Sequence, residues 1–177
     1  MLFRSSRARV GPSGEPILLL EQNRAHWDQL LISRGLTALA RARRLGRAPG
    51  SYVMQAEIVA CHAQARTPEE TDWQKIVALY SALAQLSPSP VVELNRAVAV
   101  AMANGPAAGL ELVETLAGDR TLSKYHLLPS VRGDLLQKLN RLEEARAEFE
   151  HAASLTQNVR ERQLLLERAR ACDENHA

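Results

Sequence analysis

Apolar residues recur every three or four positions from about residue 23 to residue 171. This is the spacing of one face of an α-helix, so the pattern predicts an all-α fold. Breaks rich in proline, glycine and serine divide it into helices of about 12 residues with short connections, which predicts stacked antiparallel hairpins. The predicted helices cover residues 24–44, 52–65, 72–86, 91–103, 106–117, 124–139, 142–155 and 159–171.

Three of these helices have a polar residue at the expected N-cap position. They are Asn23, Ser51 and Thr71. A side-chain oxygen at this position accepts a hydrogen bond from a free backbone N–H group of the first turn. We therefore expect these three side chains to fix where their helices begin.

The first 22 residues do not follow the helical pattern. Two apolar stretches, 8–10 and 17–20, flank the turn-forming cluster Gly-Pro-Ser-Gly-Glu-Pro at 11–16. Such a cluster between apolar runs is typical of a β-hairpin, and an irregular arm is the alternative. We therefore divide the chain into an N-terminal arm or β-hairpin at 1–22 and a helical domain at 23–177, and expect one compact unit.

Two segments of the second half, 90–118 and 124–155, are similar at an offset of 36 residues. In the second segment, the small residues Gly133, Ala145 and Ala152 and the aromatic Phe149 match the tetratricopeptide pattern. The first segment has Gly109 and Val113 where alanine and an aromatic are usual, so it is a degenerate repeat. The sequence thus predicts a tetratricopeptide-like stack, which a capping helix at 159–171 completes.

The first helices of such hairpins line a concave groove that usually holds a peptide or a partner helix. In the second segment the groove positions are Leu127, Ser130, Asp134, Gln137 and Lys138, which are mostly polar and free for a partner. The equivalent positions of the first segment are all apolar: Val91, Leu94, Val98, Ala101 and Met102. Since an exposed apolar stripe would be unusual, we expect the upstream helices to cover it.

A second candidate for partner binding lies just before the first long helix. Its residues are Glu21, Arg24, Trp27 and Asp28. Arginine and tryptophan are common anchors of interfaces, so this group could be a docking patch. The local alternative is that Trp27 packs on the core and that Arg24 or Glu21 pairs with a neighbour. The polar pair Asn95-Arg96 in an apolar helix is explained most simply by an interhelical hydrogen bond.

The composition gives no case for an enzyme. The five histidines are scattered, and the sequence has no HExxH, CxxC, GxGxxG or GxxxxGK[ST] motif, so we predict no catalytic residue, no metal and no cofactor. The remaining catalytic alternative is a hydrolase that pairs Cys61 with a distant histidine. Cations at a helix C-terminus, such as Arg41, Arg43, Arg44 and Arg47, need no ligand, and no aromatic residues interleave with them or with Arg4, Arg7 and Arg9.

Charge and targeting signals point to a cytoplasmic protein. The chain has 177 residues with 22 Lys+Arg against 20 Asp+Glu, so its net charge of +2 indicates neither nucleic acid nor a membrane as the partner. Nineteen of the basic residues are arginine and 27 residues are alanine, which favours helices. Two distant cysteines fit a reducing compartment, and the sequence has no apolar run of membrane-spanning length and no signal peptide.

Five stretches together resemble a known family. They are 18–24 with Trp27-Asp28, 52–62, 71–73 with Leu79-Tyr80, 89–99 with Gly105-Pro106, and Tyr125-His126. They resemble the C-terminal extension of a group of bacterial extracytoplasmic-function RNA polymerase sigma factors of the sigma-70 family, most specifically around Asn95-Arg96. The resemblance covers nearly the whole chain. It implies a helical, tetratricopeptide-like domain that follows two promoter-reading domains and controls or supports them through protein contacts.

The sequence departs from that family in what it lacks. Nothing resembles the domain that binds the −10 element or the helix-turn-helix that binds the −35 element, so we expect no direct DNA binding. The first residues look like the interior of the family sequence, which indicates a cut-out domain or a truncated reading frame. The hypothesis is a non-catalytic regulatory and protein-interaction domain that binds the sigma domains, core RNA polymerase or a signalling partner. The alternative is a free-standing tetratricopeptide adaptor unrelated to transcription.

Overall fold

The computed structural model describes residues 21–46 and 49–174 together with the single positions 8, 11, 17 and 19. The arm or β-hairpin expected at 1–22 lies almost entirely outside the described residues. So do the basic positions Arg4, Arg7, Arg9 and Arg47.

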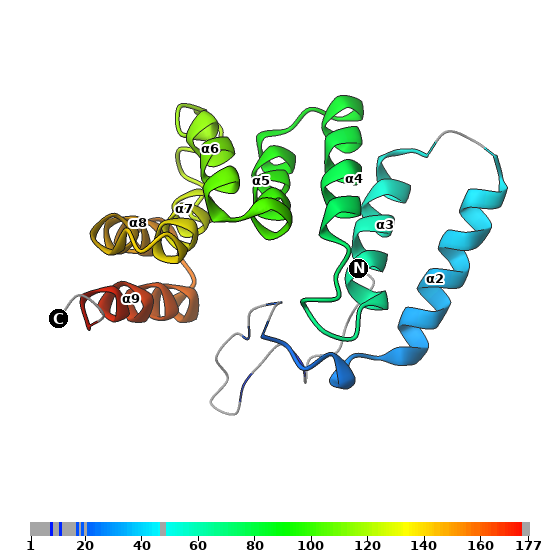
Figure 1. The fold of residues 1–177 in the computed structure, drawn as a ribbon, viewed down its shortest axis with the longest axis horizontal. Helices are drawn as coiled ribbons and strands as arrows, with labels where there is room; N and C mark the ends of the chain where they lie inside the picture. Colours follow the sequence, from blue (N-terminus) through cyan, green and yellow to red (C-terminus); the bar gives the residue numbers. More distant parts are fainter. Residues whose placement is uncertain are drawn as a thin grey trace. The chain divides into compact units, whose positions relative to one another are not determined.

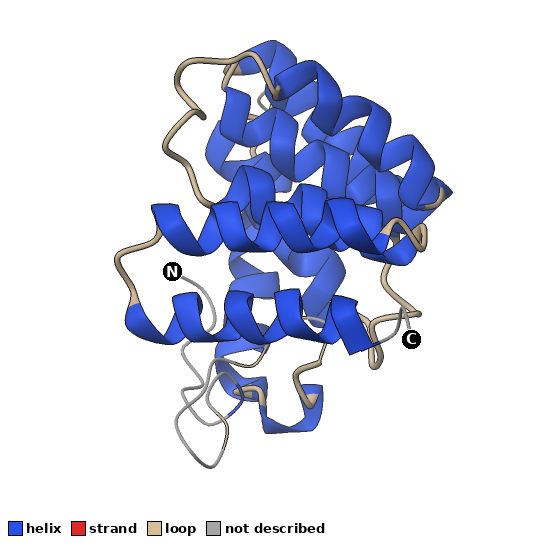
Figure 2. Cartoon of the chain, turned by 90° about the vertical axis from the view of Figure 1, so that its left-hand side faces the viewer, coloured by secondary structure: helices blue, strands red, loops and turns tan. Residues whose placement is uncertain are grey.

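The described residues form helices and no strand, which confirms the all-α prediction (Figures 1 and 2). The elements are the 3-10 helix η1 (Arg24–His26) and the α-helices α2 (Gln29–Arg44), α3 (Ser51–Gln64), α4 (Trp73–Leu86), α5 (Pro90–Asn104), α6 (Pro106–Leu116), α7 (Leu127–Lys138), α8 (Leu142–Leu155) and α9 (Val159–Glu174). Most bounds lie within a few residues of the expected ones. The largest difference is at the start of α2, followed by the start of α7 and the end of α9.

The long helix expected to begin after Asn23 is interrupted. Asn23 accepts a hydrogen bond from the backbone of Ala25 and so caps only η1. Trp27 then adopts an extended backbone with ψ of 146°, which ends the short helix. Asp28 accepts from the backbone N–H of Leu31 and is the N-cap of α2.

The two other predicted caps are also wrong. Gly50 holds the N-cap position of α3, so Ser51 is the first residue inside that helix and not its cap. Asp72 caps α4 by accepting from the backbone of Lys75 at 3.0 Å. Thr71, which we expected at this position, is buried, and its hydroxyl accepts a hydrogen bond from Arg24 of η1.

The chain divides into two compact units, Met1–Ser87 (unit 1) and Pro88–Ala177 (unit 2). The expectation of one compact unit over 23–177 stays a prediction. In unit 1, α3 packs against both α2 and α4. The buried side chains include Ile58 of α3 and Ile76 and Leu83 of α4. A smaller cluster joins Trp27 and Ile32 to Ala8.

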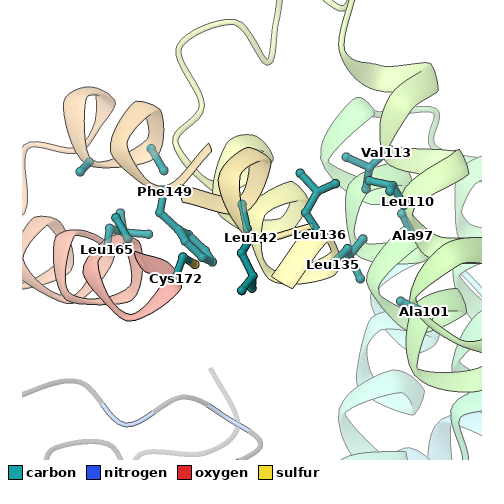
Figure 3. Packing of buried hydrophobic residues seen from close by; sticks show 14 of the residues in the cluster. Ala97, Ala101, Leu110, Val113, Leu135, Leu136, Leu142, Phe149, Leu165 and Cys172 are labelled. Carbon is teal, nitrogen blue, oxygen red and sulfur yellow. The ribbon is translucent and has the colours of Figure 1, made fainter. Parts of the chain in front are cut away.

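Unit 2 consists of the hairpins α5–α6 and α7–α8, with α9 packed against α8. Its core runs from Ala97 and Val113 through Leu136 to Phe149 and Cys172 (Figure 3). The Phe149 ring is fully buried, with 0% of its surface exposed. This continuous core through successive hairpins is what a repeat stack requires, because one hairpin alone cannot cover its apolar faces.

Small residues let the two helices of each hairpin approach closely. A Cβ atom at Gly109 would lie 2.4 Å from the Cβ of Ala101, and one at Gly133 would lie 2.8 Å from Cε1 of Phe149. Real Cβ atoms do not come so close to another heavy atom. Both glycines therefore allow the two helices of their hairpins to approach more closely than any larger residue would.

The offset of 36 residues extends into α9. The small residues Ala97, Gly133 and Ala169 are separated by this offset, and all three are buried. The arginines preceding them, Arg96, Arg132 and Arg168, share the spacing. Thus α9, expected only as a cap, repeats the pattern of the first helices α5 and α7.

Candidate protein-interaction surfaces

The guanidinium of Arg24 joins η1 to the connection between α3 and α4. Its Nη1 donates to the backbone carbonyls of His62, Ala65 and Thr67 at 2.9–3.0 Å. Its Nη2 donates to the hydroxyl of Thr71 at 3.0 Å. Only 7% of Arg24 is exposed, so these bonds are made largely out of reach of water. Burial lowers the pKa of Arg24 despite the opposing charges of Glu69 and Glu70.

Trp27 is also a core residue, with 8% of its surface exposed. Its Nε1 donates to the side-chain oxygen of Gln22 at 3.2 Å, and the Arg24 guanidinium lies 5.3 Å from the ring centroid. Both side chains are therefore used inside unit 1, which fits the local alternative, and the docking patch stays a prediction. Glu21 and Asp28 are exposed, and Asp28 serves as the cap of α2.

His62 lies in the same polar cluster. Its ring meets that of Trp73 edge-on, with 5.1 Å between the centroids. Burial, and then the positive charge of Arg24, lower the pKa of His62 to about 4. The imidazole is therefore neutral near pH 7. Within the described part of the chain, its Nδ1 and the Nε of Arg24 are buried without a hydrogen-bond partner.

The predicted groove residues of α7 share one face of the helix by their spacing. Leu127 is 41% exposed, Lys138 is exposed, and Ser130 is half-buried. Asp134 is held between two cations, with 2.8 Å from its Oδ2 to Nζ of Lys138 and 2.6 Å from its Oδ1 to Nη2 of Arg168. We call these residues, with Gln137 and Arg168, the α7–α9 surface.

The expectation that Asp134 and Gln137 are free for a partner needs correction. Arg168 Nη2 also donates to the side-chain oxygen of Gln137 at 2.9 Å, so both polar groups are already engaged by α9. Burial by itself raises the pKa of Asp134, but hydrogen bonds from Lys138 and Arg168 and their charges outweigh it and lower the pKa overall. Asp134 is therefore a carboxylate at neutral pH.

Sequence reasoning missed Arg168, although the offset of 36 residues from Arg132 was a signal. The two arginines bind different partners for a reason that the sequence explains. The partners of Arg168 are Asp134, Gln137 and the ring of Phe149, whose centroid is 4.3 Å from the guanidinium. Thirty-six positions before these three stand Val98, Ala101 and Val113, which offer no oxygen or ring on their side chains. Arg132 instead pairs with Glu114 of α6 and Glu148 of α8.

The apolar groove positions of α5 are not an exposed stripe. Leu94 and Ala101 belong to the core of unit 2, and Val98 is half-buried. The expectation that upstream helices cover this face stays a prediction. Arg96 pairs with Glu93 on its own helix at 2.7 Å, rather than across helices as expected.

The structure gives no support to a cysteine nucleophile. Cys61 is buried in α3, and its burial raises the pKa of the thiol. The reactive thiolate is therefore disfavoured at this position. Among the described residues, no group of three or more His, Cys, Asp or Glu side chains could hold a metal ion. No helix in the described part of the chain has the length and apolar character needed to cross a membrane.

The fold has a solved counterpart. The NMR structure of the first TPR domain of human RPAP3 superimposes with a TM-score of 0.53 at 21% sequence identity, over 72% of this chain and 97% of that one. The fold is tetratricopeptide-like. This likeness concerns the fold alone, because the sequence identity is low.

Two sequence comparisons add context. Residues 1–43 match a family of unknown function, DUF6596. An uncharacterized protein of Rhizobium meliloti (strain 1021) is 47% identical over 156 residues, which are 88% of this chain and 36% of that protein. The chain therefore spans about a third of the length of this curated relative.

Proposed function

We propose that this chain is a non-catalytic regulatory and protein-interaction domain of a bacterial extracytoplasmic-function sigma factor, acting in transcription initiation in the cytoplasm. The observation that carries the interaction role is the tetratricopeptide-like fold of unit 2, with the α7–α9 surface on its first helices. The sigma-factor assignment is supported by the resemblance around Asn95-Arg96. The greater length of the Rhizobium relative is compatible with such an arrangement, since it leaves room for further domains.

The α7–α9 surface offers a definite chemistry to a partner. Lys138 is exposed and uses one of its three N–H donors to bind Asp134. The two other N–H donors can therefore bind a carboxylate of the partner. Leu127, about three turns away on the same face, provides an apolar contact. The surface fits an extended or helical segment with an apolar residue at one end and an acidic residue at the other.

Binding should be measured by calorimetry against two purified partners, a promoter-reading half of a sigma factor of this group and core RNA polymerase. We expect one of them to bind. The double substitution Leu127→Ala/Lys138→Glu should weaken that binding at least tenfold, because interface anchors contribute about 1–2 kcal/mol each.

Lys75→Glu, an exposed lysine of α4, is the matched control and should leave binding unchanged. Circular dichroism checks that each variant keeps its helices. Equal binding by the double variant would remove the α7–α9 surface from the proposal.

The second candidate is a free-standing tetratricopeptide adaptor. It is favoured by one observation, namely that nearly the whole of the human TPR domain is matched. This candidate predicts that neither the sigma domains nor core polymerase binds, and that outcome would overturn the sigma-factor proposal.

A further inference from the structure

Helix α2 in unit 1 is poorly covered for an element with so many apolar residues. Of its 16 described residues, only Ile32 and Leu39 are buried. Leu30 is 61% exposed, and Leu45, just after the helix, is 76% exposed. These two leucines are large apolar side chains that remain in contact with solvent at the two ends of the helix.

A shallow groove runs along α2 beside α3. Its lining consists of Gln29, Ile32, Ser33, Leu36, Thr37, Ala40 and, from α3, Ala63. The lining mixes apolar side chains with the polar side chains of Gln29, Ser33 and Thr37. Ile32 is buried, so the accessible apolar part consists of half-buried Leu36 and Ala63 and exposed Ala40. From Gln29 to Ala40 the helix rises by about 16 Å, which matches about three turns of a partner helix.

The charges along α2 are mainly positive, with one exposed carboxylate at its N-cap Asp28. The sequence of α2 contains four arginines and no carboxylate. Arg43 pairs with Glu57 of α3 at 2.8 Å. Arg34, Arg41 and Arg44 are exposed and make no ion pair with the described residues. The helix dipole accounts for cations in the last turn, but Arg34 lies two turns earlier, so a capping role does not explain it.

We propose that the α2 groove binds an acidic amphipathic helix of a partner protein. Apolar residues at positions i, i+3, i+4 and i+7 of that helix would contact Leu36, Ala40 and Ala63. Acidic residues flanking this stripe would meet the cations of Arg34 and Arg41. A nucleic acid fits less well, because the lining is partly apolar and α2 has no aromatic side chain on which a base could stack.

This inference does not depend on the proposed function. The α2 groove belongs to unit 1, whereas the α7–α9 surface belongs to unit 2. The two surfaces can therefore be tested with separate variants of the whole chain.

The test uses a fluorescein-labelled synthetic helical peptide with leucine at i, i+3, i+4 and i+7 and glutamate at the flanking positions. Fluorescence anisotropy with the full chain should show saturable binding that weakens as salt screens the charges. The double reversal Arg34→Glu/Arg41→Glu should weaken it at least tenfold. Ala40→Glu, which places a carboxylate in the lining of the groove, should weaken it similarly.

The matched control is Arg66→Glu/Arg120→Glu, which reverses two exposed arginines elsewhere and should leave the affinity unchanged. A peptide with lysine in place of glutamate should not bind. The proposal is overturned if the acidic peptide does not bind, or if it binds the α2 variants as well as the parent. The proposal is also overturned if binding of the peptide does not depend on Arg34 and Arg41 while another interaction does. The other interactions to test are binding of a DNA duplex and self-association of the chain, measured by sedimentation.

Discussion

At the scale of single residues, the most informative side chain is Arg24. Its one guanidinium satisfies three backbone carbonyls and a threonine hydroxyl that lie 38 to 47 positions further along the chain. Planar guanidinium groups with several fixed donors are suited to this task, and a lysine ammonium is not an equivalent replacement.

Arg24→Lys should lower the free energy of unfolding by about 3 kcal/mol, because it leaves buried carbonyl groups without their donors. Urea unfolding followed by circular dichroism measures the change. Arg34→Lys, at an exposed position of α2, is the control and should cost less than about 0.5 kcal/mol. A loss of similar size in both variants would contradict the structural role given to Arg24.

His62 gives unit 1 a pH-dependent stability. Its folded pKa of about 4 lies below the ordinary value of 6.5, so between these values the unfolded chain binds a proton that the folded chain does not. The stabilisation is complete above about pH 6.5 and declines as the pH falls toward 4. Between about pH 7 and pH 5 the loss should be about 1 kcal/mol, after allowing for the partial exposure of the ring.

Unfolding experiments on His62→Asn and the parent at several pH values test this. The free energy of unfolding of His62→Asn should depend less on pH between about pH 7 and pH 5 than that of the parent. His151→Asn, at an exposed position of α8, is the control and should follow the parent. Parallel profiles for His62→Asn and the parent would assign the dependence to other groups.

The same residues show what sequence analysis could and could not foresee. The face shared by Leu127, Ser130 and Asp134 follows from helical periodicity, which is local. The true roles of Arg24 and Thr71 depend on a contact across 47 positions, and no local pattern contains it. For that reason Thr71 was expected as a cap, and for Arg24 both a docking role and a pairing with a neighbour were left open.

At the scale of elements, helix spacing in unit 2 is set by the smallest side chains. The α7–α8 hairpin requires glycine at 133, because the Phe149 ring occupies the place of a Cβ atom. The tetratricopeptide pattern predicted this packing, since it specifies residue sizes at fixed spacing. The pattern did not predict that α9 continues the repeat, because the sequence analysis contains only two copies and neither includes Arg168.

Gly133→Ala should destabilise the chain by about 1–3 kcal/mol, even though alanine has the better helix propensity, because the Phe149 ring and the backbone near Ala145 must shift. Thermal and urea unfolding measure the change. Gly118→Ala is the control, because a Cβ atom there meets nothing within 4 Å. A stabilised Gly133→Ala variant would show that the hairpin has room for a methyl group.

At the scale of the whole molecule, the chain contains two units with different kinds of surface. In unit 2 the charged groups of the α7–α9 surface are largely paired with one another, through Asp134 and its two cations. In unit 1 the α2 groove has a mixed apolar and polar lining, and the exposed arginines of α2 have no carboxylate within the same helix. A partner of unit 2 would therefore meet side chains that already form ion pairs with one another, whereas a partner of unit 1 would neutralise charges that are still exposed.

The Arg24 network also bears on the order in which unit 1 assembles. The carbonyls that Arg24 binds converge only where α3 has ended and the chain has turned toward α4. The hydrogen-bond partners of Arg24 are therefore absent until that hairpin exists, so we expect these hydrogen bonds to form late in folding. Contacts absent from the transition state act on the unfolding rate, so the loss of stability in Arg24→Lys should appear mainly as faster unfolding. In this view the hydrogen bonds of Arg24 act mainly by slowing the unfolding of the folded chain.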